Sequence, residues 1–133
     1  MNPMTTPQLY ACLKYRDADA ALAFLRALGF SERLVVRDDT NPAVVHHAQL
    51  QWRDTGGVML GSAGAGADWM TPGSTTVNLV VAEDADVDAV LAAGMAAGGR
   101  VLSAPDAAPH GGRNAALADP EGNAWNLDSY PGV

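Results

Sequence analysis

"YRDADAALAFLRALGF", residues 15–30, has a counterpart later in the chain in "AEDADVDAVLAAGMAAGG", residues 82–99. The Asp-Ala-Asp triplet at 17–19 matches the triplet at 84–86, an offset of 84 − 17 = 67 residues. The same offset relates 47–60 to 114–127, and 9–15 to 76–82. One constant offset across three segments predicts an internal repeat, so that the chain consists of two similar halves.

Each half is expected to fold as one β-α-β-β-β module. In the first half, Asp17 or Asp19 caps a helix whose leucines recur at helical spacing, and Gly29 ends it. Alternation of apolar and polar residues predicts the strands around each helix. The expected strands are 9–15, 31–37, 44–52 and 58–61 in the first half and 76–82, 100–103, 113–118 and 124–128 in the second, with the second helix at 86–97.

The predicted fold class is α+β, with the two tandem modules forming a curved mixed sheet around a cavity. Residues 1–133 are expected to form a single domain, in which module one spans 7–61, a linker rich in Gly and Ser spans 62–74, and module two spans 75–130. A single module this small would leave one face of its sheet uncovered. Two modules side by side can instead curve around a shared cavity.

Composition restricts the classes of partner. The chain has 133 residues, of which 48% are hydrophobic and 17% charged, as is typical of a globular protein. Its net charge of −7 repels phosphate groups, so we expect no nucleic acid partner and no membrane partner. Cys12 is the only cysteine, and "MNPMTTPQLY" has neither the basic start nor the apolar run of a signal peptide. These features favour a cytoplasmic location.

The segment "DPEGN", residues 119–123, predicts a tight turn before the last strand. Proline presets its own φ angle, and glycine accepts a positive φ angle that other residues avoid. The residues that follow, 124–130, alternate as in a strand.

The three segments "YRDADAALAFLRALGF", "DADVDAVLAAGMAAGG" and "DPEGNAWNL" recur in an order that spans nearly the whole chain. In these segments the sequence resembles the vicinal oxygen chelate superfamily, which includes glyoxalase I, extradiol dioxygenases, fosfomycin-modifying enzymes and bleomycin resistance proteins. The resemblance implies the paired β-α-β-β-β fold and a homodimer. It implies no particular activity, because one fold hosts many chemistries.

The resemblance also implies where a metal would be held. Metal-using members place ligands at the start of the first strand and in the last strand of each half. By the offset of 67, these positions are Tyr10, Met59, Val77 and Asn126, and none is a good ligand for a divalent ion. We therefore expect no metal, no cofactor and no catalytic residue. In this respect the chain is closest to the bleomycin resistance branch, which is metal-free and sequesters drugs.

The expected ligand site is a cavity lined by side chains of the open strand faces. His46 and His47 are adjacent, so on a strand they face opposite sides and only one can line the cavity. Trp69 lies in the linker, where it could fix the linker to a sheet or a second subunit, or stack on a planar ligand. The expected ligand-binding residues are Tyr10, Cys12, His47, Gln49, Met59 and Asn126, with Trp69 near the mouth.

The leading hypothesis is a metal-free protein that binds a hydrophobic or aromatic small molecule, as in antibiotic sequestration. A planar neutral or cationic compound is favoured over a strongly anionic one, because the protein is acidic and Lys14 is its only lysine. The alternative is a metal-dependent lyase, isomerase or dioxygenase with an atypical ligand set around His47. A third hypothesis is a subunit that regulates or scaffolds a partner enzyme. The spacing of Ser103, His110 and Asp119 does not support a catalytic triad.

Overall fold

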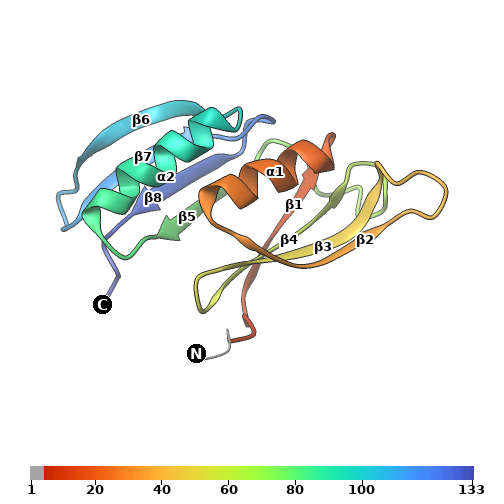
Figure 1. Ribbon diagram of the computed structural model, residues 1–133, viewed down its shortest axis with the longest axis horizontal. Helices are drawn as coiled ribbons and strands as arrows, with labels where there is room; N and C mark the ends of the chain where they lie inside the picture. Colours follow the sequence, from red (N-terminus) through yellow and green to blue (C-terminus); the bar gives the residue numbers. More distant parts are fainter. Residues whose placement is uncertain (1–4) are drawn as a thin grey trace.

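The computed structural model describes residues 5–133 and contains two modules in succession (Figure 1). The predicted domain begins at residue 1, so its first four residues lie outside the described part. Module one comprises β1 (Tyr10–Tyr15), α1 (Ala18–Leu28), β2 (Ser31–Arg37), β3 (Val45–Trp52) and β4 (Gly56–Ser62). Module two comprises β5 (Thr76–Val80), α2 (Asp84–Ala96), β6 (Arg100–Ala107), β7 (Arg113–Ala118) and β8 (Ala124–Asp128).

Each module forms its own four-stranded mixed sheet. The strand order is β1-β4-β3-β2 in one sheet and β5-β8-β7-β6 in the other. In each sheet the first strand pairs in parallel with the last, and the remaining pairs are antiparallel. The predicted α+β class with two β-α-β-β-β modules is thus confirmed. Within residues 5–133 the two sheets stay separate and share no strand pairing.

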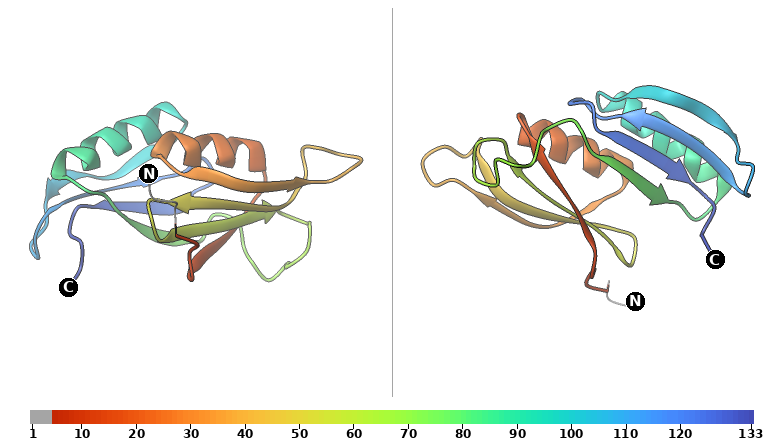
Figure 2. Two further views of the ribbon diagram at one scale, coloured as in Figure 1. Left: turned by 60° about the horizontal axis from the view of Figure 1, so that its bottom comes forward. Right: turned by 180° about the vertical axis from the view of Figure 1, so that it is seen from behind.

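The two helices lie together on one side of the sheets (Figure 2). Helix α1 contacts helix α2, which also packs on β6, β7 and β8. In the described part of the chain, no helix covers the opposite face of either sheet (Figure 2), so the side chains that alternate onto it are available for binding.

The helix termini follow from capping residues. Asp17 caps α1 by accepting a hydrogen bond from the backbone of Ala20 at 3.0 Å, and Gly29 ends the helix with a φ angle of 121°. Helix α2 begins at Asp84, two residues before the predicted start. The reason is that the Asp86 side chain accepts a hydrogen bond from the backbone of Glu83 at 3.0 Å, which fixes Glu83 as the capping residue.

Strand β6 is longer than predicted. Residues 104–107 were expected to belong to a loop because they include Pro105 and Asp106, which are poor strand formers. In the structure they extend β6 to Ala107. Because β6 is an edge strand, it can include a proline without losing a hydrogen bond to a second neighbour.

Side chains of both modules form one hydrophobic cluster. Phe30 packs against both halves. The centre of its ring lies 5.2 Å from the ring centre of Trp52 and 5.9 Å from that of Trp125. Trp125 is fully buried, and Trp52 packs against the same cluster. The core therefore fixes the position of one sheet relative to the other.

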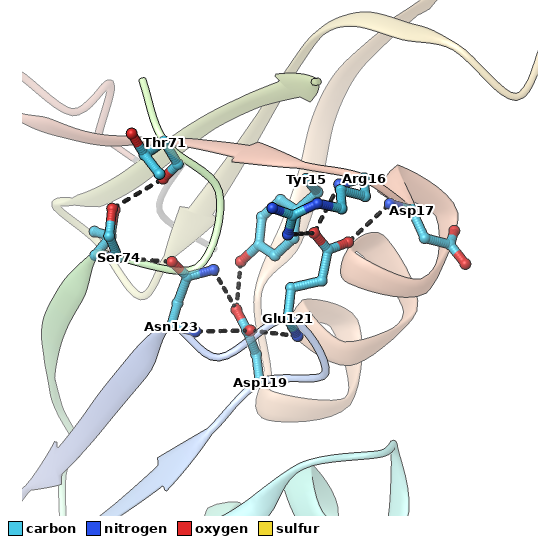
Figure 3. Close-up of polar contacts among 9 residues, drawn as sticks. Tyr15, Arg16, Asp17, Thr71, Ser74, Asp119, Glu121 and Asn123 are labelled. Carbon is cyan, nitrogen blue, oxygen red and sulfur yellow. Dashed lines mark hydrogen bonds and ion pairs between the residues drawn. The ribbon is translucent and has the colours of Figure 1, made fainter. Parts of the chain in front are cut away.

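The "DPEGN" turn connects the two modules through hydrogen bonds (Figure 3). Asp119 is buried, and its carboxylate accepts bonds from the Tyr15 hydroxyl at 2.7 Å and from Trp125 Nε1 at 3.1 Å. Glu121 accepts bonds from the backbone of Arg16 and Asp17, each at 2.7 Å, just before α1. Burial is the main cause that raises the pKa of Tyr15 above its usual range. The negative charge of the Asp119 carboxylate raises this pKa further. The turn therefore holds module two against the start of α1.

Among residues 5–133, no helix has both the length and the apolar character that a membrane crossing requires.

Candidate functional site

A hollow of about 290 Å³ lies on the open face of the first sheet, and we call it the module-one hollow. It is lined by strand residues Cys12, Lys14, His47, Met59 and Gly61 and by linker residues 65–67 and 70, among others. Its volume is at the lower end of the range that small-molecule pockets occupy. The linker after β4 thus forms one wall of the hollow, and strands form its floor.

Strand pairing explains why these side chains meet. Cys12 on β1 is opposite Met59 on β4, and Met59 is opposite Gln49 on β3. Residues paired across a sheet project to the same face. The neighbouring residues Leu13, Val58 and Leu60 project to the other face and are buried in the core.

The two adjacent histidines have different surroundings. The ring nitrogen Nε2 of His47 lies 3.1 Å from Gln49 Nε2, within the open face of the sheet. Nε2 of His46 lies 2.9 Å from an Asp38 carboxylate oxygen at the protein surface. Hydrogen bonds hold the pKa of Asp38 below its usual range. The largest effect comes from the Thr40 hydroxyl and the next largest from His46. His47 is therefore the histidine that projects onto the open face, although residue 46 also contributes to the lining of the hollow.

The second sheet has a hollow of its own, about 250 Å³ in volume, which we call the module-two hollow. Its lining is polar and consists of Asn78, Ser103, His110, Asn114, Asn126 and Asp128 together with two alanines. His110 Nε2 lies 4.0 Å from an Asp128 carboxylate oxygen, and its ring packs edge-on against Tyr130. Ser103 and His110 share this hollow, whereas Asp119 is buried against Tyr15 and Trp125. These three residues therefore do not form a triad.

The structure brings some of the predicted ligand residues together and separates others. Cys12, His47 and Met59 line the module-one hollow, and Gln49 contacts His47. Asn126 lies instead in the module-two hollow.

Two predicted aromatic residues lie outside the lining of the module-one hollow. Tyr10 covers Gly57, because a Cβ atom added at Gly57 would lie 2.5 Å from the Tyr10 ring. Trp69 is 81% exposed, and its neighbour Met70 lines the hollow.

Sequence reasoning missed Lys14, Met70 and most of the module-two hollow. Strand alternation was a signal for Lys14, since residues 10, 12 and 14 share one face of β1. Nothing in the sequence pattern indicated that Met70 would turn back from the linker towards β4.

The offset of 67 placed Val77 at one of the four ligand positions of the cavity, and this assignment was wrong. Asn126 is opposite Asn78, just as Met59 is opposite Cys12, so the offset between the first strands is 78 − 12 = 66 rather than 67. Val77 packs against the hydrophobic core. The offset of 67 does hold for the later strands: Met59 is opposite Gln49 and Asn126 is opposite Ala116, and both 126 − 59 and 116 − 49 equal 67.

The open-face positions do not fit the divalent metal that the resemblance implies for other members. The paired residues are Cys12 and Met59 in one sheet and Asn78 and Asn126 in the other. A divalent ion in such a site is held by several imidazole, carboxylate or thiolate ligands that converge on one point. In the part of the chain that the structure describes, no group of three or more His, Cys, Asp or Glu side chains has that arrangement.

Sequence comparison assigns the family. The model of the glyoxalase/bleomycin resistance protein/dioxygenase superfamily matches residues 9–127. The chain belongs to this superfamily. No curated protein sequence matches the chain significantly.

Several solved structures share the fold. A glyoxalase/bleomycin resistance protein/dioxygenase family enzyme from Burkholderia phytofirmans PsJN aligns with a TM-score of 0.70 at 21% identity, over 90% of this chain and 94% of that chain. TioX from Micromonospora sp. ML1 aligns with a TM-score of 0.68 at 26% identity, over 96% and 98% of the two chains. UcmS2 gives a TM-score of 0.67 at 20% identity, over 97% and 99%. These similarities establish the arrangement of the two modules but not a reaction.

Proposed function

We propose that this protein binds a hydrophobic or aromatic small molecule in the module-one hollow and releases it unchanged. The observation that supports the proposal most directly is the chemistry of the open-face positions. Thioether, thiol and amide side chains occupy them where metal-using relatives need imidazole and carboxylate. A superfamily fold with a hollow, whose open-face positions within residues 5–133 do not suit a divalent ion, favours binding over metal-assisted catalysis.

The composition of the hollow suits such a ligand. Met59, Met70 and the linker alanines offer apolar surface, while His47 offers a polar atom that can fix orientation. Methionine side chains adapt to ligands of irregular shape. In this proposal Trp69 serves as a stacking platform beside the hollow, because its exposed ring is free to contact a planar compound.

The experiment is a titration with a panel of peptide, quinone and glycopeptide antibiotics, followed by mass analysis of the recovered compound. At least one compound is expected to bind with micromolar affinity or better, to change tryptophan fluorescence and to be recovered unchanged. Trp69→Ala should weaken binding about tenfold, which corresponds to about 1.4 kcal/mol.

The same titration is repeated after chelation and after addition of Ni²⁺, Zn²⁺, Fe²⁺ or Mn²⁺, and elemental analysis of untagged protein accompanies it. Neither treatment is expected to alter binding. A chemically altered product, or one tightly held ion per chain, would instead support the metal-dependent enzyme. Absence of binding across the whole panel would leave the regulatory subunit as the remaining hypothesis.

We also propose that the protein forms a two-fold homodimer. The outer strands β2 and β6 expose apolar side chains, with Leu34, Val36, Val101 and Leu102 each 40% to 47% exposed. Unpaired strand edges with apolar side chains are usually covered, and two-fold pairing of identical chains is the commonest arrangement. Light scattering at micromolar concentration should therefore give twice the 13.7 kDa chain mass, about 27 kDa. A mass of one chain would contradict the dimer.

A further inference from the structure

The module-one hollow contains the only lysine of the chain. Lys14 lies on β1, two residues after Cys12 and on the same face, and it is only 7% exposed. Its partner on β4 is Gly61. A Cβ atom added at Gly61 would lie 3.3 Å from Lys14 Nζ. The glycine therefore leaves space for the ammonium group inside the hollow.

The ammonium group of Lys14 has little polar compensation. Its hydrogen bond to the backbone oxygen of Ser62 is 3.5 Å long, at the limit for such a bond. Among the ion pairs of residues 5–133, none includes Lys14, and no acidic side chain lines this hollow in that part of the chain. An ammonium group offers three donors, and burial without an opposite charge is strongly unfavourable. Within residues 5–133, no carboxylate therefore offsets the charge of Lys14 in this hollow.

We propose that Lys14 recognises a carboxylate, and that the module-one hollow takes small molecules that combine one carboxylate with an apolar or aromatic body. This inference rests on the proposed function, because it specifies which small molecules the hollow binds. The carboxylate pairs with Lys14 Nζ at the floor of the hollow. The apolar body lies against Met59, Met70 and the linker alanines.

Charge and desolvation together favour a ligand with a single negative charge. One ammonium group balances one carboxylate, and pairing restores the interactions that Lys14 lost on burial. A phosphate dianion or a dicarboxylate would bring a second charge, whereas Lys14 is the only lysine or arginine among the described residues that line the hollow, in a protein whose net charge is −7. The net charge of the protein favoured a neutral or cationic ligand, but this proposal favours a monoanionic one instead. The reason is that the nearby Lys14 ammonium group acts more strongly on the ligand than the distant surface charges do.

The test compares three probes that share a naphthalene ring: 2-naphthoate, its neutral isostere 2-naphthamide, and 2-naphthyl phosphate. Binding is measured by calorimetry and by NMR of protein labelled with ¹³C at the lysine ε carbon. Because the chain has one lysine, the spectrum contains one such signal. Wild-type protein is expected to bind naphthoate at least tenfold more tightly than naphthamide and naphthyl phosphate, and naphthoate should shift the lysine signal.

Lys14→Met removes the charge and keeps the length and apolar character of the side chain. It is expected to weaken naphthoate binding about tenfold and to leave naphthamide binding unchanged. Met59→Leu is the matched control, because it changes the apolar lining of the hollow without changing its charge. It should affect naphthoate and naphthamide equally. Circular dichroism verifies that each variant is folded.

The outcomes separate the inference from the proposed function. Equal affinity for naphthoate and naphthamide, or an unchanged preference in Lys14→Met, would overturn the role of Lys14 while small-molecule binding stands. Tighter binding of naphthyl phosphate would overturn the preference for a single charge. Failure of all three probes to bind at millimolar concentration would count against the inference. Failure of the antibiotic panel as well would overturn the proposed function itself.

Discussion

Replacing Asp119 by alanine is expected to lower the free energy of unfolding by about 4 kcal/mol. The buried carboxylate accepts five hydrogen bonds: from the Tyr15 hydroxyl, Trp125 Nε1, the backbone of Glu121, and the backbone and side-chain amide of Asn123. Alanine would leave several of these donors buried and unpaired. Each such donor costs about 1–3 kcal/mol, although the losses are not additive.

The measurement is chemical denaturation monitored by circular dichroism. Asp39→Ala is the matched control, because Asp39 is an exposed carboxylate in the loop between β2 and β3. It should change the unfolding free energy by less than about 0.5 kcal/mol. A loss below about 1 kcal/mol in Asp119→Ala would show that the turn does not hold the two modules together.

Replacing Gly94 by valine is expected to lower the free energy of unfolding by about 3 kcal/mol. Gly94 is buried where α2 meets α1 and β7. A Cβ atom there would lie 2.8 Å from Leu28 Cδ2 and still closer to Leu117 Cδ1. Both leucines are buried in the core, so neither can move without disturbing its neighbours.

Two further substitutions separate crowding from helix propensity. Ala92→Val changes an exposed position of the same helix and should lower the free energy of unfolding by less than about 1 kcal/mol. If helix propensity alone determined stability, Gly94→Ala would raise the free energy of unfolding by about 1 kcal/mol, because alanine is the best helix former. We expect a net loss instead, since overpacking typically costs 1–3 kcal/mol. A stabilised Gly94→Ala would contradict the close approach of the two helices.

Most of the fold could be predicted from the sequence because its determinants are local. Asp17 supplies an N-terminal cap, Gly29 ends a helix, and the "DPEGN" segment favours a turn through its own residues. The end of α1 and most strand boundaries agreed with the structure within two residues. The extension of β6 to Ala107 differed, because pairing with β7 outweighs the weak strand propensity of those residues.

The candidate site could be predicted only in part, because strand register is a tertiary property. A shift of one residue moves a side chain to the other face of a sheet, and this is the error that placed Val77 in the cavity. The capping residues show the same shift, since Asp17 corresponds to Glu83 and 83 − 17 = 66. Sequence similarity alone matched Asp17 to Asp84, because those residues are chemically identical.

The sequence by itself determined the two-module architecture, since repeated local signals suffice to specify repeated elements. Alternation along β1 also placed Cys12 and Lys14 on one face of that strand, whereas strand pairing decided that Met59 and His47 share this face. Only the tertiary structure decided that Met70 returns from the linker and that, within residues 5–133, no carboxylate lies beside the enclosed Lys14. Burial and charge pairing depend on segments far apart in the chain, so no local pattern can encode them.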